Sequence, residues 1–138
     1  MPGMVLDSSM TLAWFLPDEQ AAAAVELMDR VTAEGALVPT LWPIEVGNAF
    51  LNAERRGRIT AAERSHGLRL LGRLPIEIDG DTGTEAWSGS FELAERYDLT
   101  LYDAVYLELA IRRGLPLASL DAALCRAAQI AGAPIAGG

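Results

Sequence analysis

The chain of 138 residues has no lysine, one histidine and one cysteine, and each of these shortages removes a class of function. Without lysine, the chain lacks the basic residue that receiver domains and haloacid-dehalogenase-type phosphatases pair with their aspartates, and it has no Gly-x-x-x-x-Gly-Lys phosphate loop. The lone His66 does not favour a Ser–His–Asp triad, and no Gly-x-Ser-x-Gly elbow is present. The lone Cys125 cannot form a disulfide within the chain, which is typical of a reducing cytoplasm.

Long apolar runs are also missing, because charged residues interrupt every hydrophobic segment well before the ~18 residues of a membrane span. The N-terminal segment has no basic stretch and soon reaches Asp7, so we expect no signal peptide and a cytoplasmic location. The net charge of -8 argues against a protein that binds nucleic acid through charge alone. Arginines are nevertheless concentrated in one segment: Arg55, Arg56, Arg58, Arg64, Arg69 and Arg73.

Apolar periodicity predicts short strands that alternate with helices along the whole chain. The predicted strands cover residues 4–6, 36–39, 75–79, 116–119 and 133–135. The predicted helices cover residues 10–16, 18–34, 41–56, 60–74, 82–94, 100–113 and 121–131, and capping boxes are expected at 60–63 and 82–85. Short apolar strands joined by helices indicate a parallel sheet covered on both faces. We therefore expect an α/β fold, a single-domain α/β/α sandwich over residues 1–138.

The predicted helix at 100–113 is apolar around most of its circumference. We expect only a narrow strip with Glu108 and Arg112 to face water. Asp103 lies within the apolar arc, where burying an unpaired carboxylate would cost several kcal/mol. This residue therefore needs a partner.

Acidic residues fall at the ends of the predicted strands or in the first turns of the helices that follow. Asp7 and Asp121 come directly after strands, whereas Glu45 and Asp103 lie in the first turns of helices. Ligands of open α/β sheets bind outside the carboxyl ends of the strands. We therefore expect these four carboxylates to meet at one rim of the sheet.

Each acid taken alone also has an ordinary structural explanation. Asp7 and Asp121 are good N-cap residues. Thr100-x-x-Asp103 resembles a capping box, although Glu or Gln is the usual partner, and Glu45 would interact favourably with the helix dipole. These explanations do not account for the convergence of all four acids, or for the direction of Asp103.

Four carboxylates in one pocket require a cation. Two carboxylates ~4 Å apart repel each other by roughly 4 kcal/mol at an effective dielectric constant of 20. Because every donor is an oxygen, the expected ion is hard, Mg²⁺ or Mn²⁺ rather than Zn²⁺. Such sites hold phosphate oxygens and activate water for in-line attack on phosphodiesters.

The motifs that contain these acids resemble a known family. They are VLDSS at 5–9, PIEVGNA at 43–49, LYDAVYLELA at 101–110 and ASLD at 118–121. In this order and spacing they closely resemble the PIN-domain nucleases, in particular the VapC-type toxins of bacterial toxin–antitoxin pairs. The resemblance covers essentially the whole chain. It implies a Mg²⁺-dependent endoribonuclease with a central, mainly parallel five-stranded sheet.

The resemblance also implies roles for individual residues. Asp7 and Asp103 would be the most direct metal ligands. Glu45 and Asp121 would bind the metal through water, complete a second metal site or orient the attacking water. Three residues would support the site, Ser8, Asn48 and Ser119, although a capping role explains Ser8 equally well. Ser119 stands where the family often has Thr, so the hydroxyl is retained.

The resemblance further implies a homodimer and inhibition by a small cognate antitoxin, whose apolar segment would lie in a groove between N-terminal helices. The candidates for that groove or for the dimer face are Trp14, Phe15, Leu41 and Trp42. Core packing is the better explanation for at least half of them. We expect His66 to lie at the surface and Cys125 to pack as a small apolar residue.

RNA contacts are expected from the arginine segment, in particular Arg55, Arg56 and Arg58. A solvated helix-turn-helix face explains these arginines equally well. Two other functions stay open: a catalytically silent fold that binds its antitoxin and operator DNA, and a DNA-directed nuclease of the same superfamily.

Overall fold

A four-stranded parallel sheet forms the centre of the molecule, with the strand order β3-β2-β1-β4. The structure is a computed structural model that describes residues 2–16 and 22–137. Its strands are β1 (Val5–Leu6), β2 (Ala36–Pro39), β3 (Ile76–Asp79) and β4 (Leu117–Ala118). The register pairs Val5 with Leu37 and Leu117, which places the carboxyl ends of these strands at one edge.

The prediction of a fifth strand at 133–135 is wrong. Within the described residues, this segment contributes only an isolated bridge between Ile135 and Leu117. The amide of Leu117 donates to the carbonyl oxygen of Pro134 and the amide of Ala136 donates to that of Leu117, both at 2.8 Å. Pro134 has no amide hydrogen with which to extend the ladder. The sheet therefore has four strands rather than five.

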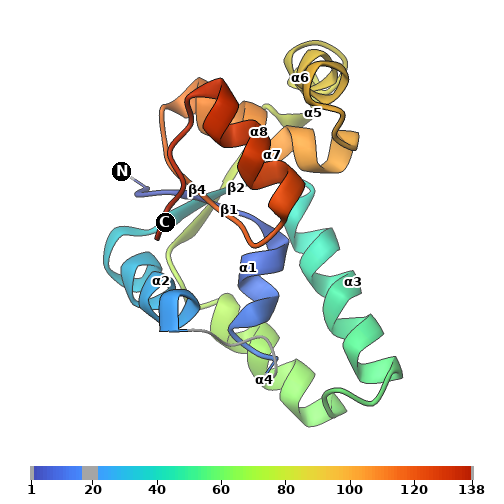
Figure 1. The fold of residues 1–138 in the computed structure, drawn as a ribbon. Helices are drawn as coiled ribbons and strands as arrows, with labels where there is room; N and C mark the ends of the chain where they lie inside the picture. Colours follow the sequence, from blue (N-terminus) through green and yellow to red (C-terminus); the bar gives the residue numbers. More distant parts are fainter. Residues whose placement is uncertain (1, 17–21, 138) are drawn as a thin grey trace.

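Helices cover both faces of the sheet, as Figure 1 shows. In that view α1, α2 and α4 lie below the sheet, and α6, α7 and α8 lie above it. The described helices are α1 (Ser8–Ala13), α2 (Ala22–Glu34), α3 (Trp42–Arg55), α4 (Ala61–Leu71), α5 (Thr82–Glu85), α6 (Gly89–Tyr97), α7 (Leu101–Arg113) and α8 (Ala122–Ala131). The α/β/α sandwich is confirmed. The predicted start of the second helix, at 18–19, lies outside the described residues.

Local sequence signals explain several helix boundaries. Pro43 lies in the first turn of α3, where its missing amide hydrogen costs nothing. Thr60 and Glu63 form the expected capping box at the start of α4. Gly114 ends α7 in the left-handed conformation with φ 65°, which glycine adopts without strain.

The predicted single helix over 82–94 is wrong, because the segment forms the one-turn α5 followed by α6. The backbone leaves the helical conformation at Ser88, with φ -122° and ψ -98°. The predicted capping box at 82–85 does not form, and the hydroxyl of Thr82 accepts a hydrogen bond from the amide of Thr40 instead. Trp87, at the break, is 91% exposed.

The core centres on β1, β2 and the middle of α7, where residues 104–110 are all buried. Trp14 and Trp42 also belong to the core, so core packing is confirmed for two of the four aromatic and apolar candidates. Phe15 and Leu41 are half-buried against the core. Across the described ranges, no helix combines the length and apolar character that membrane crossing demands.

The expected polar strip on α7 is also wrong. Glu108 is only 8% exposed. The guanidinium of Arg112 donates to Glu108 and also to both carboxylate oxygens of Asp79, at 3.2 and 2.8 Å. Asp79 ends β3 and is itself buried. These charges therefore attach α7 to the sheet instead of facing solvent.

Candidate functional site

The carboxylate of Asp7 is buried at the end of β1 and held by hydroxyl groups. Ser9 and Ser119 both donate to its Oδ2, at 2.7 and 2.6 Å, and Ser8 donates to Oδ1 at 3.3 Å. Asp7 occupies the N-cap position of α1, but its side chain makes no capping hydrogen bond. The capping explanation for this carboxylate is therefore wrong. The side chain points instead toward the end of β4.

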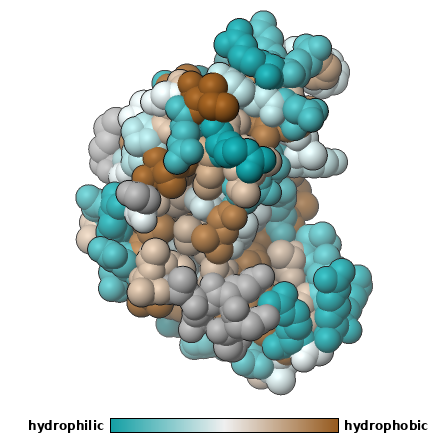
Figure 2. All heavy atoms as spheres, in the orientation of Figure 1, coloured by the Kyte–Doolittle hydropathy of each residue, from teal (hydrophilic) through white to brown (hydrophobic). Residues whose placement is uncertain are grey.

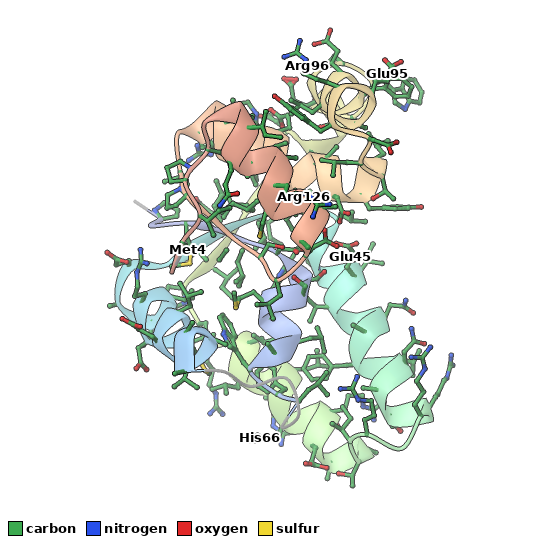
Figure 3. The ribbon with its side chains drawn as sticks, viewed as in Figure 1. Met4, Glu45, His66, Glu95, Arg96 and Arg126 are labelled. Carbon is green, nitrogen blue, oxygen red and sulfur yellow. The ribbon has the colours of Figure 1, made fainter. Side chains whose placement is uncertain are left out.

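The carboxylate of Glu45 is held from a different element. Glu45 lies in the first turn of α3, at the upper end of that helix in Figure 3. The hydroxyl of the buried Tyr106, on α7, donates to its Oε1 at 2.5 Å. Burial raises the pKa of Glu45, the hydrogen bond from Tyr106 opposes that rise, and repulsion from Asp7 and Asp103 adds to it.

Asp103 has the most perturbed carboxylate of the group. Burial, followed by repulsion from Asp121 and Asp7, raises the pKa of Asp103 to about 6. Its backbone amide donates to Thr100 Oγ1, so one half of the capping arrangement is present. Because Asp103 also repels Glu45, it interacts electrostatically with all three of the other acids.

Asp121 caps a helix and also belongs to the group of four acids. It caps α8, since its Oδ1 accepts a hydrogen bond from the amide of Leu124 at 2.9 Å. Its own amide donates to Ser119 Oγ at 3.0 Å, so the serine that holds Asp7 also fixes the backbone of Asp121. The capping explanation is correct here, and it leaves Oδ2 of Asp121 outside that hydrogen bond.

Within the described residues, the four carboxylates lack a basic partner. Among the described residues, no arginine or histidine forms an ion pair with any of them. In the same ranges, no three His, Cys, Asp or Glu side chains lie in an arrangement that holds a metal ion as they stand. The oxygen donors and the uncompensated negative charge match the chemistry of a hard divalent cation.

The sequence matches a known protein family over most of its length. The family model described as PIN domain matches residues 4–130, which is most of the chain. The chain belongs to the PIN-domain family.

Individual relatives of this PIN domain come from Pyrobaculum aerophilum. The chain is 29% identical over 120 residues to a protein named ribonuclease VapC3, a match that covers 86% of this chain and 88% of that protein. The crystal structure of PAE2754 from the same organism superimposes with a TM-score of 0.68 at 24% identity, over 91% of this chain and 79% of that one. The second likeness shows the shared fold.

The residues expected to support the acids differ in their contacts. Ser119 contacts Asp7 closely, and Ser8 contacts it at the longer distance. Asn48 is exposed on α3 and, among the described residues, its side chain makes no hydrogen bond. The sequence did not single out Ser9 or Tyr106. Tyr106 lies three positions after Asp103, on the same face of α7, and that spacing was the available signal.

The sequence also singled out His66, Cys125 and a group of arginines. His66 is exposed on α4, as expected. Cys125 is half-buried, and its thiol donates to the carbonyl oxygen of Ser119 at 3.4 Å. Burial raises the pKa of this thiol, which disfavours its reactive thiolate form. The candidate RNA-binding residues are all exposed: Arg55, Arg56 and Arg58.

Proposed function

We propose that this PIN domain, over residues 1–138, is a Mg²⁺-dependent endoribonuclease and the toxin of a toxin–antitoxin pair. The main support is the electrostatic coupling of Asp103 with Asp7, Glu45 and Asp121, without a basic partner in the described residues. The similarity to a protein named ribonuclease VapC3 supports RNA, rather than DNA, as the substrate.

The four acids are the proposed catalytic and metal-binding residues. Asp7 and Asp103 are the direct ligands of Mg²⁺, with Mn²⁺ as the alternative ion. Glu45 and Asp121 act through water, complete a second metal site or orient the attacking water. A bound ion would supply a Lewis acid for a phosphate oxygen and lower the pKa of a water molecule.

The hydrogen bonds around the acids determine which carboxylate oxygens can take these roles. Ser9 and Ser119 occupy Oδ2 of Asp7, which leaves Oδ1 with the longer contact from Ser8. Tyr106 donates to Oε1 of Glu45, and the carboxylate would accept a proton from water or orient it. Holding each carboxylate from a separate element limits the rearrangement that catalysis requires.

The proposed partners are RNA, a small cognate antitoxin and a second copy of the chain. Exposed apolar side chains support an interface of this kind, since Ile44 is 71% exposed on α3 and Ile78 is 51% exposed on β3. A cytoplasmic location agrees with the single cysteine. Light scattering during size-exclusion chromatography, with and without the antitoxin, tests the two protein partners.

Side-by-side digestion of RNA and DNA tests the proposed activity. We expect the wild type to cleave RNA with Mg²⁺, to leave DNA intact and to lose activity in EDTA. Asp103→Asn should abolish cleavage. Asp98→Asn is the matched control, because Asp98 is exposed and has a left-handed backbone that asparagine also adopts.

Other outcomes would point to the other functions. Preferential cleavage of DNA would indicate a DNA-directed nuclease. Growth arrest that persists in the Asp103→Asn variant would favour a protein that acts by binding. RNA cleavage that survives EDTA would overturn the metal-dependent mechanism.

A further inference from the structure

A cleft of about 480 Å³ opens beside the acidic site, between α1 and α3. Ser9 and Asp121, which belong to that site, line the cleft together with Arg56 and Arg58. Its other lining residues are mostly apolar: Leu12, Leu16, Ala49, Asn52, Ala53 and Leu120. The cleft therefore joins the carboxylates to two arginines of a strongly acidic chain.

One face of α3 connects the acidic site with the arginines. Glu45, Ala49, Asn52 and Arg56 follow one another at spacings of four, three and four residues, which places them on one side of the helix. At a rise of 1.5 Å per residue, Glu45 and Arg56 are about 16 Å apart along the helix axis. This distance is longer than one nucleotide of an extended RNA strand.

The chemistry of the lining matches a single-stranded RNA. Apolar side chains offer a surface for the flat face of a base, and an exposed amide such as that of Asn52 forms hydrogen bonds with base edges. Arginine is well suited to phosphate oxygens. Figure 2 shows hydrophilic side chains gathered at the lower right, over the end of α3 and the start of α4.

We propose that this cleft is a nucleotide subsite, which holds the RNA strand next to the phosphate that is cleaved. Arg56 contacts a backbone phosphate, and Asn52 forms a hydrogen bond with a base. This subsite rests on the proposed ribonuclease function. An apolar peptide would match the cleft walls, but it has no need of arginines at one end and the proposed metal site at the other.

A matched pair of arginine variants tests the phosphate contact. Arg56 lines the cleft, whereas Arg96, on α6, is exposed and lies outside both the cleft and the arginine segment. Each arginine is changed to Gln separately, in the background of the Asp103→Asn variant, which is expected not to cleave RNA. The affinity for a short, fluorescently labelled, random-sequence RNA is then measured at several salt concentrations with Mg²⁺ present.

We expect Arg56→Gln to weaken RNA binding roughly fivefold. The slope of log K against log[salt] should also fall by about 0.7, the value for one phosphate contact to a single strand. Arg96→Gln should leave the slope close to that of the parent. A merely structural role for Arg56 would not change the number of counterions released.

A second variant tests base recognition in the otherwise wild-type chain. Asn52→Ala should change the nucleotide preference at one position beside the cleavage site, as read by sequencing of the fragments, while Arg96→Gln should not. Circular dichroism and thermal unfolding check that each variant is folded.

The possible failures are distinguishable. Equal salt slopes for the two arginine variants, together with an unchanged preference in Asn52→Ala, would overturn the subsite and leave the cleft to a peptide partner. Absence of RNA cleavage by the wild type would overturn the ribonuclease function instead. In that case, the binding slopes would still decide whether the cleft holds RNA.

Discussion

The hydroxyl of Tyr106 donates a 2.5 Å hydrogen bond to Oε1 of Glu45 and thereby joins α7 to α3 at the acidic site. Tyr106 is fully buried, so its hydroxyl has no solvent to replace this partner. The bond crosses between the two helices that carry Glu45 and Asp103. The relative position of these two carboxylates therefore depends on it.

Tyr106→Phe should lower the rate of RNA cleavage about tenfold, as expected for loss of a group that orients a metal-site ligand. The change should cost ~1 kcal/mol of folding stability. Because the lost hydrogen bond opposes the rise in the pKa of Glu45, the acidic limb of the pH–rate profile should move to higher pH. Tyr102→Phe, at an exposed neighbouring position, should leave the cleavage rate, the folding stability and the acidic limb unchanged. An unshifted limb would show that Glu45 does not limit the rate at low pH.

The pKa of about 6 for Asp103 predicts a pH dependence of stability in metal-free protein. Between the ordinary value of 3.8 and about 6, the folded chain holds more protons on this group than the unfolded chain does. Stability should therefore fall as the pH rises through that window. Asp103→Asn should remove this contribution to the dependence of stability on pH. The variant should also unfold at a higher temperature than the wild type at neutral pH in EDTA. A less stable variant under those conditions would contradict the electrostatic account of the site.

Mg²⁺ should stabilise the folded protein, because a ligand that binds only the native state shifts the unfolding equilibrium. At a concentration one hundred times the Kd, the expected gain is about 2.7 kcal/mol. Urea unfolding measured with Mg²⁺ and with EDTA gives the difference directly. Asp103→Asn should lose most of this gain, and the control Asp98→Asn should retain it. Equal gains in both variants would place the ion elsewhere.

The acidic rim was predictable because it depends on local features of the chain. Asp7 and Asp121 directly follow the apolar strands β1 and β4. Glu45 and Asp103 lie in the first turns of their helices. A parallel sheet brings such positions to one edge whatever the details of packing. For these four residues, periodicity and helix-start signals located the strand ends and the first turns.

The contacts that hold the rim were not predictable, because they join residues far apart in the sequence. Ser119 reaches Asp7 across 112 positions and Tyr106 reaches Glu45 across 61. Periodicity assigned Glu108 and Arg112 to water, since it cannot show that Asp79 lies opposite them. The break between α5 and α6 has a local cause instead, because Gly83 and Gly89 weaken the helix and the backbone leaves the helical conformation at Ser88.

Arg112→Leu should destabilise the protein by about 3–5 kcal/mol, because it leaves the buried Asp79 and Glu108 without their main partner. Hydrogen bonds from Arg112 lower the pKa of Asp79, so this stabilisation is present above the ordinary pKa and is lost as the pH falls through the folded value. Urea unfolding at neutral and acidic pH checks both statements. Arg30→Ala removes an exposed pair with Glu34 and should change stability by only ~0.5 kcal/mol.

The paired serine hydroxyls at Asp7 give a test that is independent of RNA cleavage. Ser9 and Ser119 donate to the same oxygen, Oδ2, so removing either one leaves the carboxylate freer to rotate. Ser9→Ala and Ser119→Ala should each weaken Mn²⁺ binding about tenfold, as followed by the electron paramagnetic resonance signal of the free ion. Because the two hydroxyls share one acceptor, the fold-loss of Mn²⁺ affinity in the double variant should be smaller than the product of the fold-losses in the two single variants. Ser65→Ala, on α4, should bind Mn²⁺ as the wild type does, and a strictly multiplicative double variant would show that the two serines act separately.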